Sequence, residues 1–404
     1  MTTLGDVTDL DAQDPLAAHR DRFVGTASDL VYLDGNSLGR PLTVTGERLR
    51  TFVDDEWGGR LIRGWDESWF LLPEVVGDEI GRVCLGAAAG QTVVGDSTTV
   101  LLYKLMRSAV AARPGRTEIV LDRDQFPTDR YVAAGVAEEC GLTLRWIDVD
   151  TSAGVTADQL AEVVGEQTAF VVLSHVAYRS AWLADVPALT QIAHDAGALV
   201  LWDLSHSVGS VPMSLDAWDV DLAVGCTYKY LNGGPGAPAF VYVAARLLDD
   251  VTQPVQGWMG AHDPFLMGPT YAPAKGVRRM LSGTPPVVGM LALQDMLALI
   301  DEVGMDAVRA KSVGLTEHAI ATAADLLPDT TLASPRDAER RGGHVTLNHP
   351  LMREVTAELW RRDVIPDYRD PHGLRLGLSP LSTSYAEVGR GLQAVREVLD
   401  SLTA

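Results

Sequence analysis

Residues 199–243 read LVLWDLSHSVGSVPMSLDAWDVDLAVGCTYKYLNGGPGAPAFVYV, and this stretch decides the fold. It contains three short segments, at 199–203, 222–225 and 239–243, that are apolar at odd and even positions alike, as strands covered on both faces of a sheet are. Strand-like segments at 118–122, 142–147 and 169–175 precede them, and amphipathic stretches lie at 128–140, 156–165 and 186–196. This alternation predicts βαβ units that build a mostly parallel sheet.

The length of 404 residues is too great for one small core. We expect a large α/β domain over residues 56–290 and a smaller α+β domain over residues 291–404, which the N-terminal segment 1–55 joins. Residues 251–290 are rich in Gly, Pro and Met and predict a long functional excursion over the sheet.

The composition excludes several classes of protein. A net charge of −21 argues against a nucleic-acid partner, because phosphate backbones bind basic surfaces. No apolar run is long enough to span a membrane, and the N-terminus lacks the apolar core of a signal peptide. The three cysteines lie far apart, which fits neither a disulfide framework nor a metal site and indicates a reducing compartment. We therefore expect a cytoplasmic enzyme or binding protein that needs no metal.

Ligands of open α/β sheets bind at the carboxyl ends of the strands, so the residues that follow each strand were compared. Lys229 lies between two tyrosines before a Gly/Pro loop, where burial would lower the pKa of an imine-forming lysine. Asp203 ends a strand, Phe126 follows another, and Ser97, Thr98 and Thr99 begin a helix. Singly, these are a surface lysine, helix caps and a core aromatic. Together they predict the lysine, ring acid, stacking aromatic and phosphate site of a pyridoxal phosphate enzyme.

A competing motif is Gly35-Asn-Ser37-Leu-Gly39, which matches the G-x-S-x-G nucleophile elbow of α/β-hydrolases. That elbow follows several strands and leads directly into a helix. Here the motif precedes the whole βα series, and Arg40-Pro41 follows it. A serine nucleophile is therefore the weaker interpretation.

The sequence resembles kynureninase, a pyridoxal phosphate-dependent enzyme of the aspartate-aminotransferase fold (fold type I). The resemblance rests on WDLSHSVGSVPMSLDAWDVDLAVGCTYKYLNGGPGAPAFVYV (202–243), LDGNSLGRP (33–41), QFPTDRY (125–131), QGWMG (256–260), GTPP (283–286) and PDYRDPHGLRLGLSPL (366–381). These matches run in order along nearly the whole chain. They imply hydrolysis of L-kynurenine or 3-hydroxykynurenine to an anthranilate and L-alanine, a step of tryptophan catabolism, in a homodimer with shared active sites. They also reassign the GNSLG motif to the substrate pocket.

The resemblance implies a role for each matching position. Lys229 would form an imine with the cofactor, and Tyr228 would supply a proton. The remaining cofactor contacts would be Asp203 and Asp129 at the pyridinium, Phe126 over the ring, Thr98, Thr99 and Tyr228 at the phosphate, Ser174 and His206, with Trp258 and Thr284 reaching the partner's cofactor. The substrate would be bound by Asn36, Ser37, Trp65 and Arg375, the last as a bidentate clamp on the α-carboxylate.

Two departures from the family pattern put the substrate's ring in question. The family's HVNYRTG is here HVAYRSA at 175–181, and the histidine after the G-W-x-G motif is replaced by Ala261, with His262 one place later. A kynureninase-like enzyme for a ring-modified kynurenine is therefore one alternative. Another is a different lyase of the same fold, such as a cysteine desulfurase-like enzyme, although no cysteine lies in the C-terminal part. A catalytically dead homologue that serves as a binding module is disfavoured by the complete set of site residues.

Overall fold

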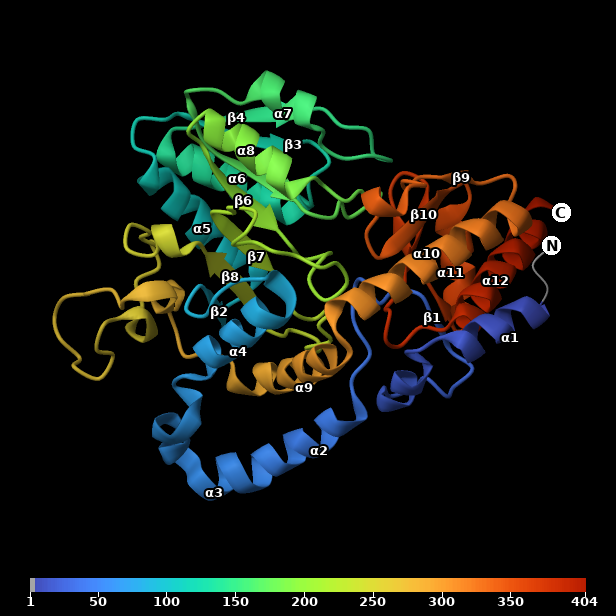
Figure 1. Ribbon diagram of the computed structural model, residues 1–404, viewed down its shortest axis with the longest axis horizontal. Coiled ribbons are helices and arrows are strands. Elements are labelled where there is room, and N and C mark those ends of the chain that lie inside the picture. The colour runs from blue at the N-terminus through green and yellow to red at the C-terminus, as the bar shows by residue number, and fades with distance from the viewer. Residues whose placement is uncertain (1–3) are drawn as a thin grey trace.

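The computed structural model describes residues 4–404, and its largest sheet has seven strands in the order β2-β8-β7-β6-β5-β3-β4 (Figure 1). The strands are β2 (Thr92–Gly95), β3 (Glu118–Asp122), β4 (Thr143–Ile147), β5 (Thr168–Ser174), β6 (Leu199–Asp203), β7 (Leu222–Gly225) and β8 (Ala239–Val243). Neighbours pair in parallel except at β8, which is antiparallel to β7 and β2. The predicted mostly parallel α/β sheet is confirmed, and β2 is an edge strand that the sequence pattern did not reveal.

Helices flank this sheet, and those from α5 to α8 connect its strands. They are α4 (Leu72–Ile80), α5 (Thr98–Ala112), α6 (Pro127–Cys140), α7 (Ala157–Val163), α8 (Val186–Asp195) and α9 (Val287–Val303). Helix α5 begins where Oγ of Ser97 accepts a hydrogen bond from the amide of Val100, and α7 begins with a capping box between Thr156 and Gln159. Because α5 packs against β5, β6, β7 and β8, its first turn is held at the carboxyl edge of the parallel strands.

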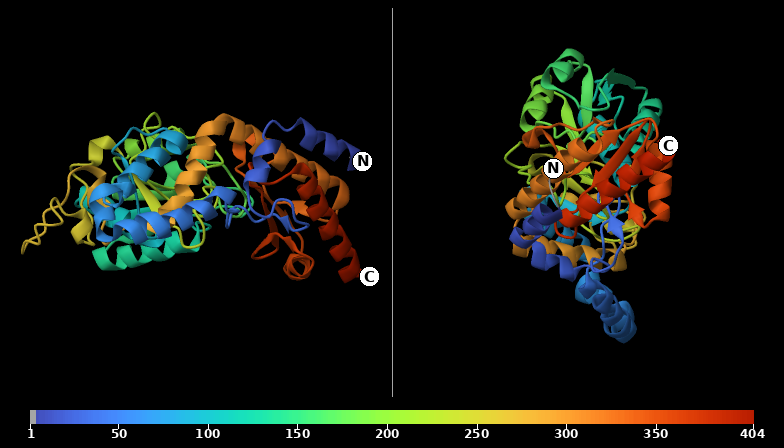
Figure 2. Two further views of the ribbon diagram at one scale, coloured as in Figure 1. Left: turned by 90° about the horizontal axis from the view of Figure 1, so that it is seen from below. Right: turned by 90° about the vertical axis from the view of Figure 1, so that its right-hand side faces the viewer.

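The second domain is built on an antiparallel sheet of four strands in the order β12-β13-β10-β9. Its strands are β9 (Thr331–Leu332), β10 (His344–Asn348), β12 (Asp367–Arg369) and β13 (Gly373–Gly377), and its helices are α10 (Met305–Leu326), α11 (Met352–Arg361) and α12 (Tyr385–Thr403). The N-terminal helix α1 (Leu4–Gln13) packs on α12, and β1 (Val31–Tyr32) pairs with β11 (Val364–Ile365). The two domains lie side by side, with both termini at the far end of the smaller one (Figure 2).

The two hydrophobic cores divide within α10. Met290, Leu293 and Met296 of α9 belong to the core of the large sheet, although the sequence placed residues from 291 onward in the small domain. Helix α10 runs from one domain into the other, with Val308 in the first core and Leu315 in the second (Figure 1). We therefore propose that α9 belongs to the large domain.

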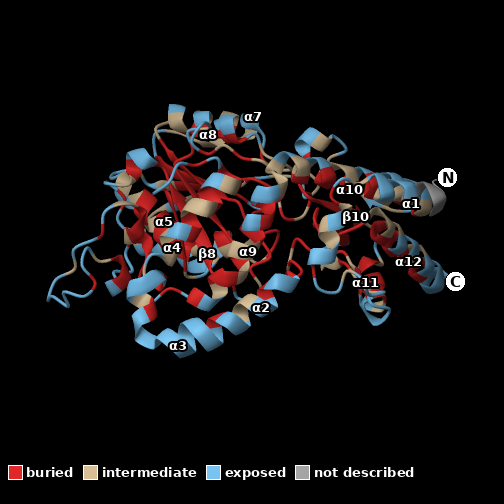
Figure 3. Ribbon diagram, turned by 60° about the horizontal axis from the view of Figure 1, so that its bottom comes forward, coloured by how far each residue is buried: buried red, intermediate tan, exposed pale blue. Residues whose placement is uncertain are grey.

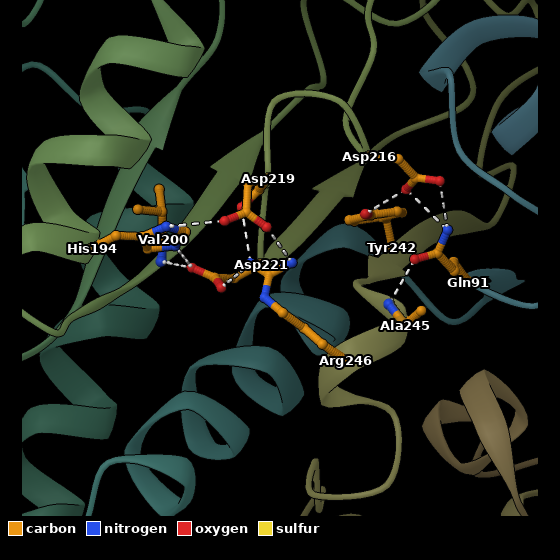
Figure 4. A network of polar contacts seen from close by, with 9 residues as sticks. All are labelled: Gln91, His194, Val200, Asp216, Asp219, Asp221, Tyr242, Ala245 and Arg246. Atoms are coloured by element: carbon orange, nitrogen blue, oxygen red, sulfur yellow. Dashed lines mark hydrogen bonds and ion pairs between the residues drawn. The ribbon is translucent and has the colours of Figure 1, made fainter.

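Polar contacts tie the strands together at the edge opposite their carboxyl ends. Asp221, just before β7, accepts hydrogen bonds from the amide of Val200 (2.8 Å) and from Arg246 (2.6 Å), and it lies 2.8 Å from Nε2 of His194 (Figure 4). Asp216 accepts hydrogen bonds from Gln91 and Tyr242 in the same region. These groups connect α8, β6, β7 and β8 and do not contact the carboxyl edge of the sheet. We therefore propose that they stabilise the fold.

Two exposed segments of the large domain carry unusually apolar side chains. One contains α2 (Thr43–Thr51) and α3 (Gly58–Arg60), and it projects away from the sheet; the other is the excursion near residue 265 (Figures 1 and 3). Ile62 is 77% exposed in the first segment, and Met267 is 75% exposed in the second. Exposed patches of this kind mark contact surfaces. Within residues 4–404, no helix is long and apolar enough to cross a membrane.

Candidate active site

A cavity of about 520 Å³ opens at the carboxyl edge of the large sheet. Its walls are Gly95, Asp96, Ser97, Thr98, Thr99, Phe126, Thr128, Asp129, Asp203, Ser205, Tyr228, Lys229, Gly236, Ala237, Pro238 and residues 281–286. The volume falls within the range of small-molecule sites. Residues that the sequence places just after the strands of the large sheet therefore share one cavity, because parallel strands end at the same edge of a sheet.

Lys229 is buried, and Nζ lies 2.9 Å from Nε2 of His206. Two other lysines are buried as well, but each has a carboxylate partner: Lys104 is 2.6 Å from Asp96, and Lys311 is bound by an aspartate of the N-terminal segment. In the described part of the chain, no carboxylate lies within ion-pair distance of Lys229. Burial lowers the pKa of the Lys229 ammonium, which favours the neutral, nucleophilic amine.

Asp203 and Asp129 form an acidic pair that lines the same cavity. Asp203 ends β6, and one of its carboxylate oxygens accepts the backbone N–H of Ser205 at 2.8 Å. Asp129 lies in the first turn of α6, and burial, reinforced by the charge of Asp203, raises its pKa well above the usual range. The raised pKa of Asp129 favours its protonated form beside the Asp203 carboxyl group. One buried oxygen of Asp129 has no hydrogen-bond partner among residues 4–404, so it is available to a ligand.

The N-terminus of α5 forms a third wall. Thr98 and Thr99 are the first two residues of the helix, and both line the same cavity as Lys229. The first N–H groups of a helix lack intrahelical partners and carry a partial positive charge. Such a terminus with hydroxyl side chains binds phosphate.

Phe126 completes the enclosure. Its ring lies 5.8 Å from Nζ of Lys229 and packs edge-on against Tyr178. A flat heterocycle in the cavity would therefore have an aromatic ring, a pair of carboxyl groups and a helix terminus among its walls. These donors and acceptors fit the ring, aldehyde and phosphate of pyridoxal phosphate.

Comparison with known proteins agrees with this geometry. The family model for class-V aminotransferases matches residues 83–359. The kynureninase of Pseudomonas fluorescens is 39% identical over 412 residues, covering 100% of this chain and 97% of its own length. That of Burkholderia pseudomallei (strain K96243) is 38% identical and covers 99% of this chain and 96% of its own. The chain belongs to the kynureninase family, within the class-V aminotransferases.

Solved structures with the same fold are more distant in sequence. A C-DES mutant with glycine covalently linked to its PLP cofactor superposes with a TM-score of 0.84 at 19% identity, covering 94% of this chain and 99% of its own. The cysteine desulfurase of Thermococcus onnurineus NA1 gives 0.78 at 18% identity, with 98% of each chain covered. At this identity the likeness shows the fold alone, and it confirms fold type I for this kynureninase-family chain.

Eight of the predicted site residues line the cavity, and the others lie outside it. Ser174 ends β5 beside Asp203 and donates a hydrogen bond to Gln125 at 2.8 Å. His206 lies behind Lys229, where burial holds its pKa well below the usual range and keeps the imidazole neutral. Thr284, which the resemblance directs toward a partner subunit, lines the cavity of its own chain.

The two predicted tryptophans lie on outer segments. Trp65 packs edge-on against Trp69, in a small cluster with Val287 and Leu291 of α9. Helix α9 follows directly after Pro286, which lines the cavity, so this cluster flanks the cavity rather than forming its wall. Trp258 is 40% exposed on the 251–290 excursion.

The predicted substrate clamp, Arg375 on β13, is fully buried. Its guanidinium donates to the carbonyl of Tyr178 (2.7 Å) and to Oγ of Ser37 (2.9 Å), and it pairs with Asp367 at 2.6 Å. With its amide oriented to suit its neighbours, Asn36 accepts from Nε of Arg375 at 3.1 Å. Asn36, Ser37 and Arg375 thus form one network.

The GNSLG segment contacts both the Arg375 network, through Ser37, and the backbone next to Lys229, through Gly39. The amide of Gly39 donates to the carbonyl of Tyr228 at 2.9 Å, and a Cβ on Gly39 would lie 2.5 Å from the carbonyl oxygen of Lys229. The glycine therefore allows a close backbone approach to the lysine. Because Ser37 accepts a hydrogen bond from Arg375, it belongs to an ion-pair network and is no hydrolase nucleophile.

Sequence reasoning missed part of the cavity wall. Asp96 and the segment 281–286 line it, and of these residues only Thr284 was assigned a role, toward the partner's cofactor. The position of Asp96 before the helix cap was an available signal. The segment 281–286 does not directly follow a strand of the large sheet, so the positions of the strand ends could not predict that it lines the cavity.

Proposed function

We propose that this chain is a pyridoxal phosphate-dependent kynureninase that cleaves the Cβ–Cγ bond of L-kynurenine or 3-hydroxykynurenine by hydrolysis. The products are an anthranilate and L-alanine. Lys229 carries the proposal, because its amine is buried without a carboxylate partner in the same cavity as Asp203. The full-length similarity to two kynureninases supports the choice of reaction within the fold.

The cavity residues divide the chemistry between them. A bound pyridoxal phosphate supplies an electron sink for the substrate's Cα. Asp203 would hold the pyridinium nitrogen, supported by its buried neighbour Asp129, whose pKa is raised. Nζ of Lys229 would hold the cofactor's aldehyde carbon, and its amine would be a base for the Cα proton. Thr98 and Thr99 would hold the phosphate at the helix terminus.

Tyr228 is the proposed proton donor. Its side chain lines the cavity next to Lys229, and burial raises its pKa above the usual range, so the phenol stays protonated. A phenol that retains its proton can deliver it to a carbon that gains electron density. The substrate's α-carboxylate would be held by Arg375, after that side chain exchanges Asp367 for the substrate.

Turnover tests this proposal. The purified protein should be yellow, the colour should be removed by borohydride, and L-kynurenine or 3-hydroxykynurenine should give a fluorescent anthranilate. Lys229→Ala is the control, and it should fold and produce no anthranilate. A colourless protein that takes up no pyridoxal phosphate, or a yellow protein inactive on both substrates, would refute the assignment.

We also propose that the protein is a homodimer. Exposed apolar side chains on two segments support this: Trp57, Leu61, Ile62 and Leu71 on the first, and Trp258, Phe265, Leu266 and Met267 on the second. Isolated monomers rarely leave so many large apolar groups in water. Light scattering after gel filtration should give twice the chain mass, and a monomer at micromolar concentration would contradict the proposal.

A kynurenine with a modified ring is a second candidate substrate. The departure from the family pattern at 175–181 lies next to the clamp, because the carbonyl of Tyr178 accepts from Arg375. Ala181 adopts φ +64° there, where the family has glycine. Comparing kcat/KM for L-kynurenine with that for hydroxylated and methylated kynurenines decides between the two. A clear preference for a methylated ring would favour the second candidate.

A further inference from the structure

Lys104 lies on the inner side of α5 and has no exposed surface. Its Nζ donates to Oδ2 of Asp96 at 2.6 Å and to the backbone carbonyl of Met280 at 2.8 Å. Lysine is almost never fully buried unless its charge is paired. Lys104 is therefore a built-in contact between two chain segments that are far apart in sequence.

Both of those segments form walls of the cavity. Asp96 lines it directly, immediately before Ser97 and the phosphate-binding turn of α5. Met280 precedes the segment 281–286, which forms another wall. One buried ammonium thus fixes the turn and the wall relative to each other.

Asp96 is held in an unusual position. Its backbone has φ +48°, in the left-handed region that non-glycine residues rarely adopt. Its carbonyl accepts the amide of Ala239 on β8 at 3.0 Å, and its carboxylate turns toward Lys104. The side chain remains 31% exposed, and Asp96 is one of the residues that line the cavity. An unpaired carboxylate here would repel a phosphate dianion bound at the adjacent helix terminus.

We propose that Lys104 is a positioning residue for the cofactor's phosphate, which neutralises Asp96 and anchors the 281–286 wall. This inference rests on the cofactor proposed above. It assigns opposite effects to the two partners, because the lysine makes the phosphate site less negative and the aspartate makes it more negative. A purely structural pair would instead weaken cofactor binding whichever partner is changed.

The dissociation constants of pyridoxal phosphate and of pyridoxal, which lacks the phosphate, test the proposal on the cofactor-free protein. Lys104→Met should weaken pyridoxal phosphate binding about 10- to 100-fold and change pyridoxal binding about threefold or less. Asp96→Asn should leave pyridoxal phosphate binding unchanged or tighter. The double variant should recover most of the loss, and it also serves if Lys104→Met alone does not fold.

Lys311→Met is the matched control, because it removes a buried lysine–aspartate pair, with Asp14, whose residues do not line the cavity. It should lower thermal stability without changing the affinity for pyridoxal phosphate. Equal weakening of both ligands by Lys104→Met, or weaker binding in Asp96→Asn, would overturn the inference. If the wild-type protein takes up no pyridoxal phosphate, the proposed function itself fails, which is a separate result.

Discussion

Replacing Arg375 with lysine separates the charge of this residue from its geometry. The buried guanidinium reaches Tyr178, Ser37 and Asp367 at 2.6–2.9 Å. Lysine keeps a positive charge for Asp367, but its ammonium cannot donate two parallel hydrogen bonds to a carboxylate. Arg375→Lys therefore isolates the contribution of bidentate binding to recognition of the substrate's α-carboxylate.

The size of the effect follows from the bonds lost. A hydrogen bond to a charged group contributes about 1.5–3 kcal/mol, so losing one of two parallel bonds lowers kcat/KM about 10- to 150-fold, mostly through KM. Arg375→Ala is a poorer test. It removes the Arg375 partner of Asp367, which keeps only Arg369, and the cation 4.0 Å from Asp34, and removing one partner of a buried pair costs about 3–5 kcal/mol in folding free energy.

Steady-state kinetics with L-kynurenine, together with thermal unfolding of each variant, measure the two effects separately. Arg369→Lys is a matched control, because Arg369 pairs with the same Asp367 through Nε at 2.8 Å and is not assigned to the substrate. It should leave KM within about twofold of the wild-type value. A KM for Arg375→Lys that is equally unchanged would refute the carboxylate clamp.

Three further predictions address single groups. Lys229→Ala should fold, bind the cofactor without the borohydride-sensitive link and show no turnover; measurable turnover would remove this lysine from the mechanism. Tyr228→Phe should lower kcat about 10²- to 10⁴-fold, whereas Tyr230→Phe, at a buried phenol that has no hydrogen-bond partner in the described chain, should not; equal losses would contradict a proton donor at Tyr228. The hydrogen bond to Asp221 raises the pKa of His194, so its stabilisation is complete below the unfolded value of about 6.5 and is lost as pH rises through the higher native pKa. The difference in urea unfolding free energy between wild type and His194→Gln should therefore shrink with rising pH, and a constant difference would exclude this linkage.

Much of the large sheet could be predicted from the sequence, because buried parallel strands are short apolar runs between amphipathic helices. The bounds of β3, β6, β7 and β8 agree exactly with the expected segments. The direction of β8 could not be predicted, since an apolar run looks the same in either direction. Strand β2 was missed because Thr92–Gly95 is short and its partner, β8, lies about 150 residues away in the chain.

The candidate site also contains residues that the sequence could predict and residues that it could not. Lys229, Asp203 and Phe126 could be placed together because strand ends share one edge of the sheet. The burial of Lys104 could not be foreseen, because it depends on a carboxylate eight residues earlier and on a carbonyl 176 residues later. Arg375 was found only through the family resemblance, since no pattern of spacing connects β13 to the edge of another domain.

The three buried lysines show what makes one of them suited to chemistry. Burial lowers the pKa of each ammonium, but aspartate partners oppose that shift at Lys104 and Lys311 and hold both as structural cations. Lys229 faces the imidazole of His206, whose own pKa is lowered, so both groups favour their neutral forms. A carboxylate in place of that imidazole would keep the lysine charged and inert. At Lys229 burial is the largest cause of the lowered pKa, and no hydrogen-bonded carboxylate in the described chain offsets it, so this amine is the one suited to act as a nucleophile.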